Sequence, residues 1–131
     1  MRLEHVAIDV HDPVAMAAWY VENLGMTIVR SEHVSPFAHF LADGTGQSVI
    51  EIYNNPATTV PDYSTVHPLQ QHFAFNVDDM EQTHAALVAA GATAAGPINT
   101  TPAGDQLAFL RDPWNVTIQL VKRNVPLLGK Q

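Results

Sequence analysis

The chain has 131 residues, enough for a single domain with a hydrophobic core of its own. Thirteen acidic against six basic residues give a formal net charge of −7, which opposes binding to nucleic-acid phosphates or to an anionic membrane surface. Cysteine is absent, which excludes disulfides, thiolate metal sites and cysteine nucleophiles. No apolar run resembles a signal peptide or a membrane span, so we expect a cytoplasmic protein.

The first half of the chain predicts one helix and four strands. The alternating stretch Leu3–Val10 is typical of a strand. Asp12 and Pro13 then begin a helix as its N-cap and first residue, and Gly25 ends it. Further strands are expected at residues 26–33, 37–42 and 48–53.

The second half repeats this order of elements. Residues 71–80 read QHFAFNVDDM, close to EHVAIDVHDP at residues 4–13, and residues 71–77 fall in a predicted strand over Gln70–Val77. Asp79 caps the next helix, which ends at Gly91. The remaining strands are expected near residues 92–98, 106–111 and 116–122. HFLAD at residues 39–43 also aligns with AFLRD at residues 108–112, and this register predicts a duplicated β-α-β-β-β unit.

We therefore predict one α+β domain over residues 1–131, built from two such modules. They cover about residues 3–54 and 70–123, and a C-terminal tail occupies residues 124–131. The segment between the modules, about residues 55–69, is rich in proline and has little periodicity, which indicates a linker. Its length allows the modules to pair within one chain or with the modules of a second chain.

Four polar side chains fall at matching places in the two modules. His5 and His72 open the first strand of each module, and Glu51 and Gln119 lie in the last strands between aliphatic residues that face the other way. If the modules pair about a pseudo-twofold axis, the four side chains converge. Two imidazoles, a carboxylate and an amide oxygen suit one divalent metal ion such as Fe, Ni, Co, Mn or Zn.

The sequence resembles the vicinal oxygen chelate superfamily, which includes glyoxalase I, bleomycin and fosfomycin resistance proteins and extradiol dioxygenases. The resemblance covers about residues 3–123 and is carried by LEHVAIDVHDP, WYVENLGM and FLRDPWNVTIQLVKR. The last of these is similar to the family ending D-P-x-G-N-x-x-E-L. The resemblance implies a glyoxalase-like member whose modules curl into a sheet cup around a metal, with the ligand positions at His5, Glu51, His72 and Gln119.

Three positions depart from the pattern of glyoxalase I. The family's glutamate in the last strand is Gln119, and its amide does not accept a proton near neutral pH. Short bacterial glyoxalases carry an arginine for the glutathione carboxylate where this chain has Asp9. Both differences argue against a true glutathione-dependent lactoylglutathione lyase. Asn115 replaces the glycine of the ending, and because asparagine tolerates a left-handed conformation we expect the turn to be kept.

The function predicted first is a metal-dependent glyoxalase-like lyase or isomerase. It would act on a small substrate that chelates the metal through adjacent oxygens, with Glu51 as the proton-transfer base. An Fe(II)-dependent, extradiol-type dioxygenase is the first alternative, because two histidines and one carboxylate form the triad that such enzymes use. A non-catalytic, ligand-sequestering protein like the bleomycin-binding members is the second alternative, although it gives Glu51 and the histidines no purpose.

Four further residues are candidates for contact with the substrate. Asp9, Tyr53 and Asn76 lie on the strand faces that carry the metal ligands, and they are predicted to line the cup. His39 is included as a substrate-facing residue, with a structural role as its alternative. Open sheet edges and a concave face also predict a homodimer.

Overall fold

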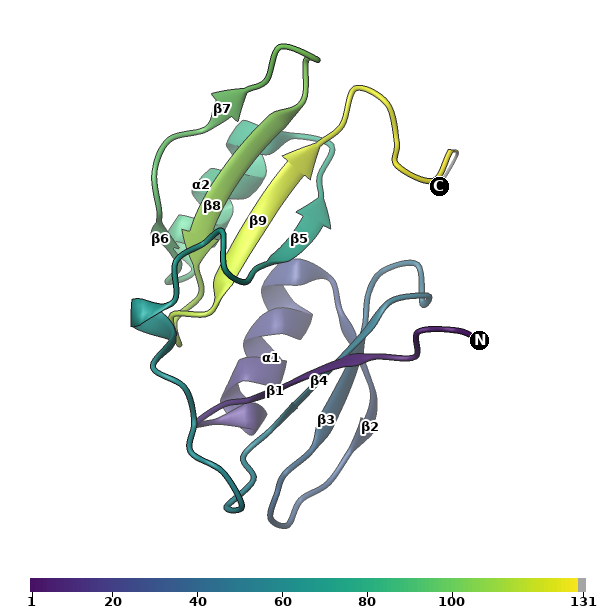
Figure 1. Cartoon of the computed structure of the whole chain (residues 1–131), viewed down its shortest axis with the longest axis vertical. Helices are drawn as coiled ribbons and strands as arrows, with labels where there is room; N and C mark the ends of the chain where they lie inside the picture. Colours follow the sequence, from purple (N-terminus) through teal and green to yellow (C-terminus); the bar gives the residue numbers. More distant parts are fainter. Residues whose placement is uncertain (130–131) are drawn as a thin grey trace. The chain divides into compact units, whose positions relative to one another are not determined.

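The structure is a computed structural model that describes residues 1–129. It divides into two compact units, of which the first covers Met1–Pro61 and the second begins at Asp62. Each unit holds one α-helix and one mixed β-sheet (Figure 1). The predicted α+β fold with two β-α-β-β-β modules is confirmed. The predicted C-terminal tail ends in Lys130 and Gln131, which lie outside the described residues.

The first unit is a four-stranded sheet in the order β1-β4-β3-β2, with one helix against it. Strands β1 and β4 run parallel, whereas β4, β3 and β2 are antiparallel neighbours. The core between sheet and helix contains Met16, Tyr20, Leu41 and Ile52, all of them fully buried. The elements of this unit are β1 (Val6–Asp9), α1 (Pro13–Leu24), β2 (Thr27–Ser31), β3 (His39–Ala42) and β4 (Val49–Tyr53).

The signals that predicted α1 are all present in the structure. The Asp12 carboxylate accepts a hydrogen bond of 3.1 Å from the amide of Ala15, and Pro13 is the first helical residue. Gly25 ends the helix in the left-handed conformation, at φ 66°. The helix α2 of the second unit begins in the same way, because Asp79 accepts a hydrogen bond from the amide of Gln82.

The second unit repeats the strand order of the first as β5-β9-β8-β6, and it adds β7 beside β8 (Figure 1). Again the first and last strands, β5 and β9, run parallel. The helix α2 contacts this sheet over β9, where Ile118 and Leu120 are fully buried, as is Leu110 of the adjacent β8. The elements are η1 (Tyr63–Thr65), β5 (Phe73–Asn76), α2 (Met80–Ala89), β6 (Thr93–Ala94), β7 (Asn99–Thr100), β8 (Gln106–Arg111) and β9 (Thr117–Lys122).

Several element boundaries differ from the prediction. Of the strand expected near residues 92–98, only β6 forms, and β7 follows after it. Gly96 at φ 100° and the following Pro97 interrupt the pairing with β8 between them. The first strands begin at Val6 and Phe73, one residue after the histidines. Their pairing with β4 and β9 starts at these residues, with Val6 opposite Ile50 and Phe73 opposite Ile118.

The same turn precedes the last strand of each module. Gly46 and Asn115 both have positive φ, 72° and 69°, and the amide of each donates to the carbonyl of the aspartate three residues earlier, Asp43 or Asp112. The prediction that Asn115 keeps the left-handed turn is therefore confirmed. Among the helices of residues 1–129, none is long and apolar enough to cross a membrane.

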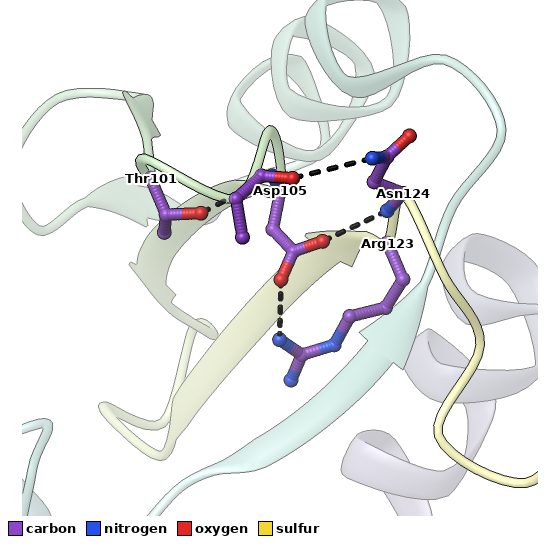
Figure 2. Close-up of polar contacts among 5 residues, drawn as sticks. Thr101, Asp105, Arg123 and Asn124 are labelled. Carbon is purple, nitrogen blue, oxygen red and sulfur yellow. Dashed lines mark hydrogen bonds and ion pairs between the residues drawn. The ribbon is translucent and has the colours of Figure 1, made fainter.

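Asp105 fastens the start of β8 to the segment that follows β9 (Figure 2). Its carboxylate accepts 2.8 Å and 3.1 Å hydrogen bonds from the Asn124 amide and the Arg123 guanidinium. These bonds, the one from Asn124 first and the one from Arg123 next, hold the pKa of Asp105 below its ordinary value of 3.8. The backbone amide of Asp105 donates a further hydrogen bond to the hydroxyl oxygen of Thr101.

Because the folded state lowers the pKa of Asp105, its stabilising contribution is present above the ordinary value of 3.8 and is lost as the pH falls through the folded value. We expect Asp105→Asn to lower the melting temperature at about pH 7 and the difference from wild type to shrink in acid. Thermal unfolding over a pH series measures this. Glu32→Gln, which alters an exposed carboxylate, is the control. A difference for Asp105→Asn that grows in acid would contradict the argument.

Candidate functional site

The sheet of the first unit has one face toward α1 and one face free of it. The strand register places Ala7, Phe40 and Glu51 side by side across β1, β3 and β4. The alternate residues Leu41 and Ile52 belong to the buried core. We call the face that carries Phe40 and Glu51 the helix-free face of the first unit.

His5 lies next to Glu51 on this face. Its Nε2 is 3.4 Å from Glu51 Oε1, and the two side chains are 31% and 17% exposed. Its other ring nitrogen, Nδ1, is 3.0 Å from the carboxylate of Glu4. The edge of the His5 ring packs against Phe40, with ring centroids 5.4 Å apart at 84°. The imidazole is therefore held on two sides and presents Nε2 to the carboxylate of Glu51.

The second unit repeats this arrangement with one change of chemistry. His72 Nδ1 is 2.7 Å from the carbonyl oxygen of Pro68, so that Nδ1–H donates and Nε2 is left for another partner. The His72 ring packs against Phe109 at 5.2 Å and 67°. Phe109 in turn pairs across the strands with Gln119, as Phe40 pairs with Glu51. The helix-free face of the second unit thus carries an amide where the first carries a carboxylate.

The two phenylalanines were not among the predicted site residues. The aligned pieces HFLAD and AFLRD contain them at the same position, and they pair with Glu51 and Gln119. The sequence repeat alone could therefore have identified them as site residues. Each phenylalanine fixes the ring plane of one histidine, a function that the predicted donor set alone did not account for.

Within each unit, the donor atoms are arranged as ligands of a divalent metal ion would be. Histidine ligands commonly donate their second ring N–H to a carboxylate or a carbonyl, as both His5 and His72 are placed to do. Two donors about 2.1 Å from one tetrahedral ion lie about 3.4 Å apart, which is the spacing of His5 Nε2 and Glu51 Oε1. No three histidine, aspartate or glutamate side chains within residues 1–129 gather into a metal site. Each unit offers two of the four predicted donors, and their convergence stays a prediction.

A sequence model of the Glyoxalase/Bleomycin resistance protein/Dioxygenase superfamily matches residues 2–120. The chain belongs to this superfamily. The resemblance that the sequence suggested is thereby confirmed, whereas membership leaves the choice among glyoxalase, dioxygenase and antibiotic-binding activities open. No curated protein sequence matches the chain.

Several solved structures share the fold. A glyoxalase family protein from Bacillus cereus is 18% identical, with 93% of each chain covered and a TM-score of 0.80. TnmS3, an antibiotic binding protein from Streptomyces sp. CB03234, is 20% identical over 95% of this chain and 97% of that one, with a TM-score of 0.72. A glyoxalase I mutant from Zea mays is 24% identical over 93% of this chain and 45% of that one, with a TM-score of 0.74.

The predicted substrate contacts occupy different surroundings. Asp9 and Tyr53 pair across β1 and β4 on the helix-free face, but Asp9 is buried and its carboxylate accepts a 2.8 Å hydrogen bond from the amide of Asn55. Tyr53 is half-buried. Asn76 is exposed at the end of β5, on the side of the second sheet that carries Gln119. For these three residues, contact with the substrate stays a prediction.

His39 is placed differently from the other candidates. It pairs with Ile52, on the face of the first sheet opposite to Glu51, and it is 4% exposed. Its Nδ1 lies 2.6 Å from the carbonyl oxygen of Phe37. The structure therefore favours a structural role for His39 over the predicted contact with substrate, because strand alternation turns it into the core.

Arg111 holds the segment that orients His72. Its guanidinium donates to the carbonyls of Tyr63 and Val66 at 2.7 Å and 2.9 Å, and to that of Asn115 at 3.0 Å. These contacts fix the end of the linker against β8, immediately before Pro68, whose carbonyl accepts the His72 ring proton. Arg111 is therefore a positioning residue for His72.

We expect Arg111→Met to lower the free energy of unfolding by about 1–3 kcal/mol, because carbonyls of the clamped segment lose a charged donor. Amide exchange at Thr65 and Val66 should accelerate, and the ¹⁵N signals of the His72 ring should move toward a tautomer mixture. Arg123→Met, which breaks one ion pair elsewhere in the unit, is the matched control. Unchanged His72 ring signals in Arg111→Met would show that the clamp does not position the imidazole.

Proposed function

We propose that the protein is a metal-dependent lyase or isomerase of the glyoxalase type, which acts on a small molecule with adjacent oxygen atoms. The observation that carries the proposal is the duplicated geometry. His5 Nε2 and Glu51 Oε1 lie 3.4 Å apart on one helix-free face, and His72 and Gln119 hold the corresponding places on the other. The proposal requires the modules to pair about a pseudo-twofold axis, so that both helix-free faces line one cup.

His5, Glu51, His72 and Gln119 would hold one divalent ion, such as Fe, Ni, Co, Mn or Zn. When bound, such an ion supplies Lewis-acid polarisation of a substrate carbonyl. The histidines are preset for this role, because the Nδ1 of each is engaged and Nε2 is presented. The edge contacts with Phe40 and Phe109 keep the rings in place and cover part of their surface against water.

Glu51 is the residue that moves the proton. Its carboxylate accepts a proton from the carbon beside the substrate carbonyl and returns it to the neighbouring carbon, so that no proton is gained or lost overall. At 17% exposure, the carboxylate is partly withdrawn from water and is available to the substrate on the helix-free face. Gln119 cannot share this role, because an amide does not take up a proton near neutral pH.

An Fe(II)-dependent dioxygenase is the second candidate, and one observation favours it. The predicted donor set contains a single carboxylate, Glu51, beside two histidines, which is the ligand triad of such oxygenases. A ligand-sequestering protein is the third candidate, supported by the structural likeness to an antibiotic binding protein. The two experiments below separate these three functions.

The first experiment tests the metal. We expect about one divalent ion per chain, and His5→Ala or His72→Ala should each remove most of it, because each deletes one imidazole donor. His33→Ala, which removes an exposed histidine, is the matched control. Elemental analysis of protein purified without a chelating tag gives the stoichiometry. Full metal content in the His5/His72 double variant would overturn the catalytic proposal and leave sequestration.

Sedimentation of the same samples tests the oligomeric state. We propose a homodimer at micromolar concentration, since the helix-free faces and open strand edges offer surface to a second copy. A monomer that still binds one metal ion per chain would instead place both modules of one cup in a single chain.

The second experiment tests the base. Glu51→Gln should lower proton-exchange activity about 10²–10⁴-fold and retain part of the metal affinity, because an amide oxygen still coordinates. Gln119→Glu should tighten metal binding by adding a carboxylate. For a dioxygenase, Gln119→Glu should instead lower activity, since the new carboxylate would occupy a position that O₂ or substrate needs.

Proton exchange by NMR on 2-hydroxycarbonyl compounds is measured beside oxygen consumption of the iron-loaded protein with catechols and 2-oxoacids. Oxygen uptake that depends on substrate, without proton exchange, would replace the lyase or isomerase by the oxygenase. If the protein binds ligands tightly but shows neither proton exchange nor oxygen uptake, the result would favour sequestration.

A further inference from the structure

A cavity of about 410 Å³ opens on the first unit beside the His5–Glu51 pair. It is lined by Glu4, Val29, Arg30, Phe40 and Val49. Two of these residues connect it to His5, because the Glu4 carboxylate contacts His5 Nδ1 and the Phe40 ring contacts the His5 ring. A molecule in this cavity would therefore lie next to the proposed metal ligands of the first unit.

A β-bulge places Arg30 on the wall of this cavity. In the pairing of β2 with β3, Ile28 lies opposite Leu41, and Arg30 lies opposite Phe40, so that Val29 is an extra residue without a partner. In a regular ladder Arg30 would stand opposite His39, on the side of the sheet core. The bulge thus turns Arg30 to the face of Phe40 and Glu51. Bulges are frequent beside functional sites, where they redirect a side chain.

The guanidinium of Arg30 is available to a ligand. It lies 5.9 Å from the centre of the Phe40 ring, and it makes no hydrogen bond or ion pair with any of residues 1–129. Arg111 and Arg123 of the second unit differ, since Arg111 donates to three carbonyls and Arg123 binds Asp105. In a chain of net charge −7, a cation without a carboxylate partner at a cavity wall indicates an anionic ligand.

We propose that Arg30 binds the carboxylate of the substrate, which is a small monocarboxylic acid with a neighbouring hydroxyl or carbonyl oxygen. This inference rests on the proposed function and specifies its substrate class. The planar guanidinium takes a carboxylate through two parallel hydrogen bonds. The apolar body of the acid packs on Phe40, Val29 and Val49, and its neighbouring hydroxyl or carbonyl oxygen reaches toward His5 and Glu51.

Glu4 restricts the charge of the ligand. Its carboxylate lines the same cavity as Arg30, so a second anionic group would meet like charge. A dicarboxylate or a phosphate ester is therefore disfavoured relative to a monocarboxylate. The hydrogen-bond acceptor at Glu4 is also suited to a ligand hydroxyl.

The test uses 2-hydroxypropanoate, 2-hydroxybutanoate and 2-hydroxy-3-phenylpropanoate, each beside its neutral amide. Calorimetry and NMR titration are carried out on chelator-treated protein and on zinc-loaded protein. We expect at least one acid to bind about tenfold or more tighter than its amide, as the loss of a charge-assisted contact predicts. Arg30→Met should abolish this preference and leave amide binding unchanged, and Arg30→Lys should retain part of it.

The matched control is Lys122→Met, which removes the same charge from an exposed site outside the cavity and should bind like wild type. Equal binding of acid and amide by wild type, or an unchanged preference in Arg30→Met, would overturn the inference, as would the absence of any binding at millimolar concentration. The metal content of Arg30→Met should equal that of wild type. Loss of the acid preference in Arg30→Met with full metal content supports this inference. Absence of metal in wild type would contradict the proposed function and leave this inference to the binding data.

Discussion

In each module the first strand pairs in parallel with the last, and the site depends on this pairing. The ladders β1–β4 and β5–β9 are extended by the same backbone bond, from Val10 to Tyr53 at 2.7 Å and from Val77 to Val121 at 2.8 Å. Parallel strands cannot be joined by a tight turn. In the first unit α1, β2 and β3 together connect β1 to β4, and α1 covers one face of the sheet. The other face is left for polar side chains.

The pairing also explains why a histidine before one strand meets a carboxylate in another. Ala7 lies beside Glu51, and His5, two residues earlier on the same face, reaches Glu51 with its Nε2. A shift of the register by one residue would turn Glu51 into the core under α1, where an unpaired carboxylate is costly. The buried core residues Leu41 and Ile52 oppose that shift, so core packing and site geometry are specified by the same register.

Most of the fold followed from local signals in the sequence. The caps at Asp12 and Asp79, the stop at Gly25 and the strand β8 agree with the expectation because each depends on neighbouring residues. The repeat identified the equivalent residues of the two modules without any knowledge of contacts. The division of β6 from β7 was missed, although Gly96 and Pro97, which interrupt the pairing with β8, stand in the sequence.

The site was predicted less completely, because parts of it depend on residues that are distant in the sequence. Strand alternation placed Glu51 and Gln119 on the helix-free faces, but the bulge at Val29 is a property of two strands together and left no local mark. Arg30 was therefore not expected on the face of Phe40. Likewise, the contact of His39 with the carbonyl of Phe37 depends on a loop conformation in which Phe37 has φ 56°. A pattern of polar and apolar residues does not contain such information.

The exchange of a glutamate for Gln119 and the presence of Arg30 have the same electrostatic consequence. In the paired cup that we propose, a divalent ion together with Glu4, Glu51 and Arg30 carries one net positive charge, which a carboxylate at position 119 would cancel. Gln119 keeps an oxygen donor without that charge. A monoanionic substrate would then neutralise the cup, and the remaining surface, with its excess of acidic residues, would not compete for it. The asymmetry between Glu51 and Gln119 can therefore serve substrate selection as well as the restriction of proton transfer to one carboxylate.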